Sequence, residues 1–135
     1  MELKVEEIKS LAPIQFNYED IKKWVTEKAK EYNTLGIINA MKNNNIFVIT
    51  HPGDKGDIYI EEVAKVAKET NTKLEINSSH RFLNANQLRQ IEHIGNTFIV
   101  GSDAHVPKNV GNFNLALNTI KEAKIDLSLI ENIKF

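Results

Sequence analysis

Three side chains that can bind a divalent metal follow predicted strands of this sequence. His51 follows the apolar run at residues 46–50, and Asp103 and His105 follow the run at residues 97–100. Asp103 and His105 are two residues apart, so on an extended segment both side chains point the same way. Carboxylate and imidazole groups suit Zn²⁺, Mn²⁺ or Fe²⁺, which accept mixed oxygen and nitrogen ligands. The pattern predicts part of a metal-dependent hydrolytic site.

Each of these residues taken alone has an ordinary explanation. A single Asp-x-His pair is more often an unliganded polar loop, and His51 before Pro52 can simply satisfy a turn. His80 lies in the loop after the intervening predicted strand, either near the site or as an ordinary loop residue. His93 falls within a predicted helix and is expected to face solvent. The site prediction therefore depends on the combination of residues at strand ends.

Strands alternate with helices from residue 34 onward, which predicts an α/β fold with a parallel sheet. The first strand is continuously apolar, as expected of a strand buried on both faces. Right-handed crossovers place the carboxyl ends of parallel strands at one edge, where ligands bind. We expect strands at residues 46–50, 73–77 and 97–100, with helices at residues 35–41, 59–70, 85–94 and about 113–123.

The first part of the chain does not follow this alternation. Asn17 is a suitable N-cap for a helix over residues 18–32, and the segment before it is short and ends at Pro13. Apolar and long side chains at helical spacing centre on Trp24 and predict an amphipathic face for the core or for docking. These residues are Ile21, Trp24, Val25 and Lys28. We therefore divide the chain into a helical extension of unknown role, residues 1–33, and an α/β part, residues 34–135.

Composition excludes several classes of function. The 135 residues suffice for one domain, and 17 basic against 18 acidic residues give a net charge of −1. That balance provides no broad basic surface for nucleic acid. The absence of cysteine excludes disulfides and thiolate sites. No apolar run reaches the roughly 20 residues of a membrane span, and residues 1–7 lack a secretory signal, so we expect a cytoplasmic protein.

Three motifs resemble a known family in order and spacing. They are Thr-His-Pro-Gly at residues 50–53, Leu-Glu-Ile-Asn-Ser-Ser at residues 74–79 and Gly-Ser-Asp-Ala-His at residues 101–105. These resemble the later motifs of the PHP (polymerase and histidinol phosphatase) family, most of all its small stand-alone bacterial phosphatases. Val-Gly-Asn-Phe at residues 110–113 also resembles that subgroup. The resemblance covers residues 34–135 and implies a partial (β/α) barrel of about three parallel strands.

The resemblance also implies roles for individual residues. His51, Asp103 and His105 would ligate metal, and Asp103 and His105 would take part in catalysis. Glu75 and Asn77 would support the site, and no residue is expected to bind an organic cofactor. The implied reaction is hydrolysis of a phosphoester, such as a phosphorylated small molecule, by a metal-activated water.

The sequence departs from the family pattern at its beginning. The family opens with a His-x-His motif and carries further His and Glu ligands, whereas residues 1–50 contain no histidine. The resemblance thus corresponds to the C-terminal half of the barrel, and we expect the truncated domain to bind metal weakly and to be inactive alone. A half barrel exposes strand edges. The chain is therefore expected to form a homo-oligomer, to receive the front half from a separate chain, or to cover the opening with its N-terminal helix.

Other functions remain open on the sequence. A phosphoesterase could be assembled from two chains and be active in that form. Residues 13–24 resemble the start of an uncharacterised phage protein family, which would suggest a phage or mobile-element accessory protein. A further alternative is the tail of a repair polymerase's exonuclease domain, although the loop after His51 suits the small phosphatases better.

Overall fold

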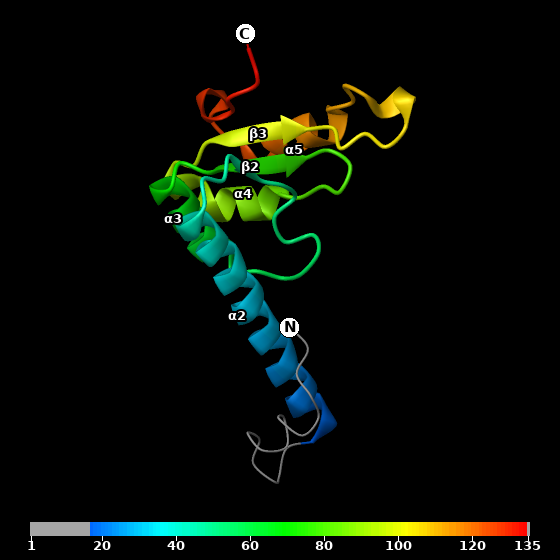
Figure 1. The fold of residues 1–135 in the computed structure, drawn as a ribbon. Helices are drawn as coiled ribbons and strands as arrows, with labels where there is room; N and C mark the ends of the chain where they lie inside the picture. The colour runs from blue at the N-terminus through cyan, green and yellow to red at the C-terminus, as the bar shows by residue number, and fades with distance from the viewer. Residues whose placement is uncertain (1–16, 135) are drawn as a thin grey trace.

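The computed structural model describes residues 17–134, so the predicted features around residues 5–13 lie outside the described residues. The chain forms a three-stranded parallel sheet with helices, and one long helix extends from it (Figure 1). The α/β prediction with a partial barrel-like arrangement is confirmed. The elements in chain order are α2 (Tyr18–Asn43), β1 (Val48–Ile49), α3 (Ile60–Glu69), β2 (Lys73–Asn77), α4 (Ala85–Ile91), η1 (Glu92–Ile94), β3 (Phe98–Gly101), η2 (Pro107–Asn109), α5 (Asn114–Ala123) and η3 (Leu127–Leu129).

Helix α2 is a single helix where the sequence predicts two. It begins as predicted at Asn17, whose side chain accepts a hydrogen bond from the Asp20 backbone N–H at 2.9 Å. It then continues past Asn33, because tertiary contacts support the segment that local propensity leaves weak. The buried Thr34 hydroxyl donates to the Lys30 carbonyl at 2.8 Å and accepts from the Tyr59 backbone N–H at 2.9 Å. The predicted boundary between residues 33 and 34 thus lies inside a helix, and the two-part division stays a prediction.

The sheet has the order β1-β2-β3, with both pairs parallel. Strand β2 occupies the predicted range and lies at the centre, with Leu74 and Ile76 fully buried. The prediction for the first strand was wrong in extent and burial. Only Val48 and Ile49 pair, both are half-buried, and the Phe47 side chain is 59% exposed. An edge strand has a neighbour on one side only, so continuous apolar character did not require burial on both faces.

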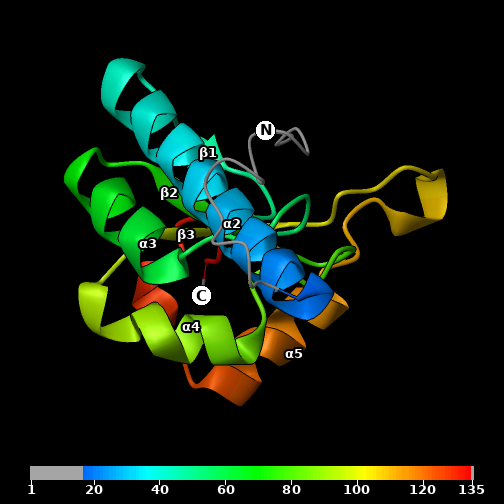
Figure 2. The same ribbon diagram turned by 90° about the horizontal axis from the view of Figure 1, so that it is seen from below.

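The helices cover one face of the sheet and form the core with it. In the view from below, α3, α4 and α5 lie in front of the strands and α2 crosses beside α3 (Figure 2). Alternate residues of β2 and β3 face these helices, whereas Glu75 and Ile99 lie on the other, half-buried face. Buried apolar side chains come from both strands and from all four helices: Met41, Val63, Ala67, Leu74, Ile76, Leu88, Ile91, Phe98, Val100, Ala116 and Ile120.

The two edges of the sheet differ. The C-terminal segment covers β3, because Ile130 forms a parallel bridge with Phe98 and the Glu131 backbone N–H donates to the Phe98 carbonyl at 2.9 Å. The Asn132 side chain then acts like a further strand residue, accepting from the Val100 N–H at 2.9 Å and donating to the Val100 carbonyl at 2.8 Å. Within residues 17–134, no strand pairs with the outer edge of β1.

Among these described residues, no helix combines the length and the apolar character needed to cross a bilayer. The longest, α2, carries charged side chains along most of its turns. Its predicted amphipathic face around Trp24 is half-buried.

Replacing Asn132 with alanine removes both hydrogen bonds to Val100. We expect the free energy of unfolding to fall by about 1 kcal/mol, since water can partly replace the lost bonds at this edge. Chemical denaturation would measure the change. Asn45→Ala, which alters an exposed asparagine, is the control, and equal stability of the two variants would contradict the assigned role of Asn132.

Candidate metal centre

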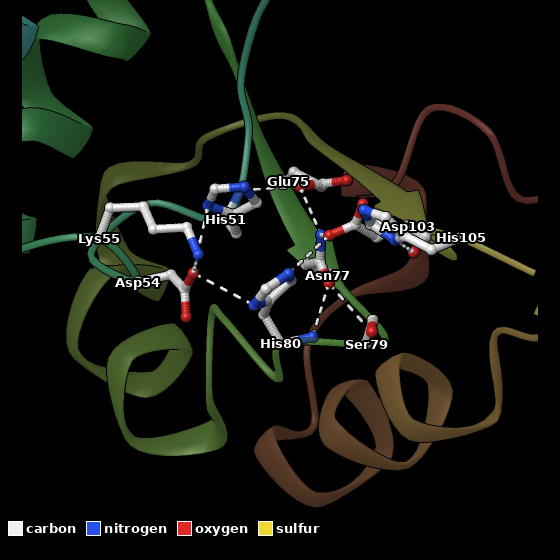
Figure 3. A network of polar contacts seen from close by, with 9 residues as sticks. All are labelled: His51, Asp54, Lys55, Glu75, Asn77, Ser79, His80, Asp103 and His105. Carbon is white, nitrogen blue, oxygen red and sulfur yellow. Dashed lines mark hydrogen bonds and ion pairs between the residues drawn. The ribbon is translucent and has the colours of Figure 1, made fainter.

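The loops that follow the three strands meet at the carboxyl end of the sheet (Figure 3). His51 lies in the loop after β1, His80 in the loop after β2, and Asp103 in the loop after β3. Each of these residues offers one ligand atom, and the three atoms lie within 4.8 Å of one another. Parallel strand direction therefore brings His51 and Asp103 together, as the sequence predicted.

His80 joins this group and His105 does not. The His80 Nε2 atom is 2.9 Å from Asp103 Oδ2. The His105 side chain is 77% exposed, with Nδ1 3.8 Å from Asp103 Oδ1 and 2.7 Å from the Asp103 carbonyl oxygen. Figure 3 shows it beside Asp103, on the side away from the other imidazoles.

The backbone at Asp103 explains this difference. Its φ of 50° breaks the extended conformation on which the expectation of parallel Asp103 and His105 side chains depended. The role of His105 as a metal ligand stays a prediction. His93 is exposed, as predicted.

Asn77 holds the loops of the site in place. Its side chain is 1% exposed, and the amide nitrogen donates to Glu75 Oε2 and to Asp103 Oδ2, both at 3.1 Å. The amide oxygen accepts from the Ser79 N–H at 3.0 Å and from the His80 N–H at 2.8 Å. All donors and lone pairs of the amide are used. These contacts fit the supporting role expected of Asn77.

Glu75 lies two residues before Asn77 on β2 and also contacts the loops of the site. Its Oε2 atom accepts a hydrogen bond from the His51 backbone N–H at 2.7 Å. Its side chain lies against Gly101 of β3, where a Cβ atom would stand 2.1 Å from Oε1. A Cβ atom at position 101 would force this carboxylate to move away from the position in which it accepts from His51, which explains the glycine of the third motif.

Two members of the metal group have backbone conformations that are uncommon outside glycine. His51 has a φ of 29° and Asp103 a φ of 50°. Such residues cost of order 1–3 kcal/mol each and concentrate at functional sites. The hydrogen bonds from the His51 backbone N–H to Glu75 and from the Asn77 amide to the Asp103 carboxylate help to hold them.

The pKa values of Asp103 and Asp54 are both lowered by their surroundings. The hydrogen bond from Asn77 lowers the pKa of Asp103, and this effect, with the charges of His105, His80 and His51, outweighs the opposing effect of burial. Burial acts to raise the pKa of Asp54, in the loop after β1. The ion pair with Lys55 and the charges of His80 and His51 outweigh it, and the pKa is lowered.

A cavity of 430 Å³ opens beside His51. Helix α2 contributes Asn33 and Ile37 to its wall, β1 forms another side, and the loop from Thr50 to Gly56 forms the rest. The wall combines apolar side chains with a few polar groups. The metal group therefore has space next to it on the side of the sheet where β1 is unpaired.

Curated proteins from several bacteria resemble this chain. A probable phosphatase of Thermoanaerobacter sp. (strain X514) is 39% identical over 112 residues, which covers 76% of this chain and 45% of that protein. A probable phosphatase of Shewanella halifaxensis (strain HAW-EB4) is 32% identical with the same coverage. One of Proteus mirabilis (strain HI4320) is 34% identical over 74% of this chain and 44% of its own length.

This chain is similar to probable phosphatases. These matches support a relationship to a phosphatase family over about three quarters of the chain. The chain spans about half the length of the curated relatives it matches. No family model matches it.

The residues present fit a divalent metal ion. Two imidazoles and one carboxylate form a donor set like that of catalytic zinc sites, which keep three protein ligands and one open position. The sequence had left His80 open, because its place depends on the turn that Asn77 organises. Asp54 was missed, since an aspartate in a loop rich in glycine and proline is ordinarily a turn residue.

Replacing Asn77 with alanine should raise the pKa of Asp103 toward the ordinary aspartate value, because the variant loses the hydrogen bond to the ionised form. In the parent chain Asp103 stabilises the fold above the ordinary aspartate pKa, and this stability is lost as the pH falls through the lowered folded-state pKa. In the variant the folded-state and unfolded-state pKa values lie closer together, so Asp103 should contribute less to stability and should take up its proton at higher pH. Carboxyl-carbon NMR titration would measure the pKa of Asp103 in both proteins.

Asp126 provides an internal reference in the same titration. Its pKa is lowered by hydrogen bonds from the Ser128 backbone and side chain, far from Asn77 in sequence, and should stay low in both proteins. An unchanged pKa of Asp103 in the variant would show that Asn77 does not stabilise its charge.

Proposed function

We propose that this chain provides a divalent-metal site to a PHP-like phosphoesterase and corresponds to the C-terminal half of its barrel. The observation that carries the proposal is the convergence of His51, His80 and Asp103 within 4.8 Å at the carboxyl end of the sheet. The similarity to probable phosphatases supports the reaction class. The PHP part of the proposal rests on the resemblance of the motifs at residues 50–53, 74–79 and 101–105 to that family.

The site residues have complementary tasks in this chemistry. When bound, a divalent ion polarises a phosphoryl oxygen and makes water more acidic. Neutral imidazoles of His51 and His80 and the ionised carboxylate of Asp103 would hold the ion, which we expect to be zinc, manganese or iron. The exposed His105 stands beside Asp103, where it can donate a proton or a hydrogen bond to a phosphorylated small molecule.

The resemblance to the PHP family implies a cluster of two or three metal ions, whereas three ligands can hold only one ion. Among residues 17–134 no larger group of metal-binding side chains forms around this centre. We therefore propose that the isolated chain binds a single ion weakly and that hydrolysis requires further ligands. This same observation favours a second candidate function, a metal-binding module without catalysis.

The outer edge of β1 suits a strand from a different polypeptide. The cavity beside it leads to His51, and the exposed Phe47 extends the apolar surface. A second copy paired through β1 about a two-fold axis would run antiparallel and place its metal group at the opposite end of the joint sheet. The β3 edge, which a head-to-tail copy would need, is covered by residues 130–132. We propose that a separate chain with a parallel strand completes the site.

Metal binding and hydrolysis should depend on different residues. We expect His51→Ala and His80→Ala to weaken Zn²⁺ or Mn²⁺ binding by at least about 10-fold, the loss typical of even outer-shell changes. Titration calorimetry would measure this, with the exposed His93→Ala as control. Hydrolysis of p-nitrophenyl phosphate by the parent chain, if measurable, should be lost in His105→Ala while metal binding remains. Unchanged binding in His51→Ala would refute the site, and metal-dependent hydrolysis by the parent chain alone would contradict both the need for further ligands and the second candidate.

Phosphatase activity per chain should not rise with protein concentration, because a second copy brings no ligand to the first copy's metal group. Parallel measurements of sedimentation and specific activity over a range of concentrations would show this. Val48→Pro serves as a probe of pairing at the outer edge of β1. The Phe47 carbonyl accepts from the Lys73 N–H of β2, so the backbone groups of the next residue, Val48, point to the outer edge. Proline at position 48 removes the N–H that a partner strand would need. Val48→Thr keeps the N–H and is the control. Activity that rises with self-association and is lost only in Val48→Pro would contradict the separate-chain proposal.

A further inference from the structure

His80 lies between two carboxylates, one at each ring nitrogen. Its Nε2 atom is 2.9 Å from Asp103 Oδ2, and its Nδ1 atom is 3.1 Å from Asp54 Oδ2. Figure 3 shows the ring between the loops after β1 and β3. The two nitrogens thus have different surroundings, since Asp103 belongs to the metal group and Asp54 does not.

Asp54 also faces the second histidine of the group. The same Oδ2 atom lies 3.8 Å from His51 Nδ1, and the His51 and His80 rings are 4.9 Å apart at their centroids. Lys55 Nζ, 3.2 Å away, balances the negative charge. One carboxylate oxygen therefore stands on the Nδ1 side of both imidazoles.

This oxygen has acceptor capacity to spare. Asp54 Oδ2 is buried and, among the described residues, makes no well-aligned hydrogen bond. A buried acceptor without a partner costs free energy, so a small rotation of the His80 ring that aligned Nδ1–H with it would be favourable. Histidines that ligate metals almost always donate their other ring N–H to such a group, which fixes the tautomer and the ring orientation.

We propose that Asp54 is the positioning residue of the metal group. It accepts the Nδ1–H of His80 and lies near that of His51, so that each ring presents Nε2 toward the ion. The inference rests on the proposed function, in which His51, His80 and Asp103 hold that ion. Asp54 itself contacts neither metal nor substrate and acts through the histidines.

The competing explanation is structural: Asp54 pairs with His80 only to fix the loop. Loss of the carboxylate would then lower stability without lowering the affinity of the folded protein for Zn²⁺. Under the positioning role, Asp54→Ala leaves Asp103 as the one carboxylate, among the residues that the structure describes, that pairs with His80. The proton of the neutral ring then moves to Nε2, which is the nitrogen needed for metal.

Two measurements on the whole chain test this role. Long-range ¹H–¹⁵N NMR of the metal-free protein, at a pH where the imidazoles are neutral, reports which nitrogen of His80 carries the proton. We expect Nδ1–H in the parent and a shift toward Nε2–H in Asp54→Ala. Titration calorimetry with Zn²⁺ should show affinity roughly 10- to 100-fold lower in that variant. Asp54→Asn, which keeps an acceptor oxygen without the charge, should lie between the two.

Asp57→Asn is the matched control, because Asp57 is an exposed carboxylate of the same loop that is outside the metal group. It should match the parent in both measurements, and circular dichroism would confirm that each variant is folded. Parent-like Zn²⁺ affinity in Asp54→Ala, or Nε2–H in the parent chain, would overturn the inference. A parent chain that binds no metal would refute the proposed function, and the tautomer measurement would still show whether Asp54 fixes the proton of His80 on Nδ1.

Discussion

The buried amide of Asn77 is the interaction on which the arrangement of the metal group depends. It stands at the end of the central strand and bonds to a side chain of its own strand, to the loop that follows and to the carboxylate after β3. Through Glu75 the same network reaches the backbone of His51 after β1. Hydrogen bonds thus connect three loops that are distant in sequence to one buried side chain, directly or through Glu75.

The charges around this amide explain why the site is suited to a cation. Two carboxylates, Asp54 and Asp103, keep their negative charge despite partial burial. The imidazole of His80 lies between them, and Lys55 balances the outer one. A divalent ion at the metal group would be drawn to the inner carboxylate, while the outer one remains available to orient the ligands.

The sequence was most informative where periodicity and strand ends determine structure. It predicted the range of β2, the parallel order and the meeting of His51 with Asp103, because these follow from apolar runs and chain direction. It was wrong about β1, whose burial depends on having neighbours on both sides, and about the break in α2, which the hydroxyl of Thr34 bridges. It did not place His80 or Asp54, because one positive φ and one organised turn determine which side chains converge.

The covering of the β3 edge by residues 130–132 has a consequence for aggregation. A sheet that exposes both edges can extend without limit, as in fibrils. Here the chain's own C-terminal segment satisfies the backbone of one edge, with the amide of Asn132 completing it. Within residues 17–134, strand addition can therefore occur only at β1, and any assembly built through backbone pairing stops after a single partner.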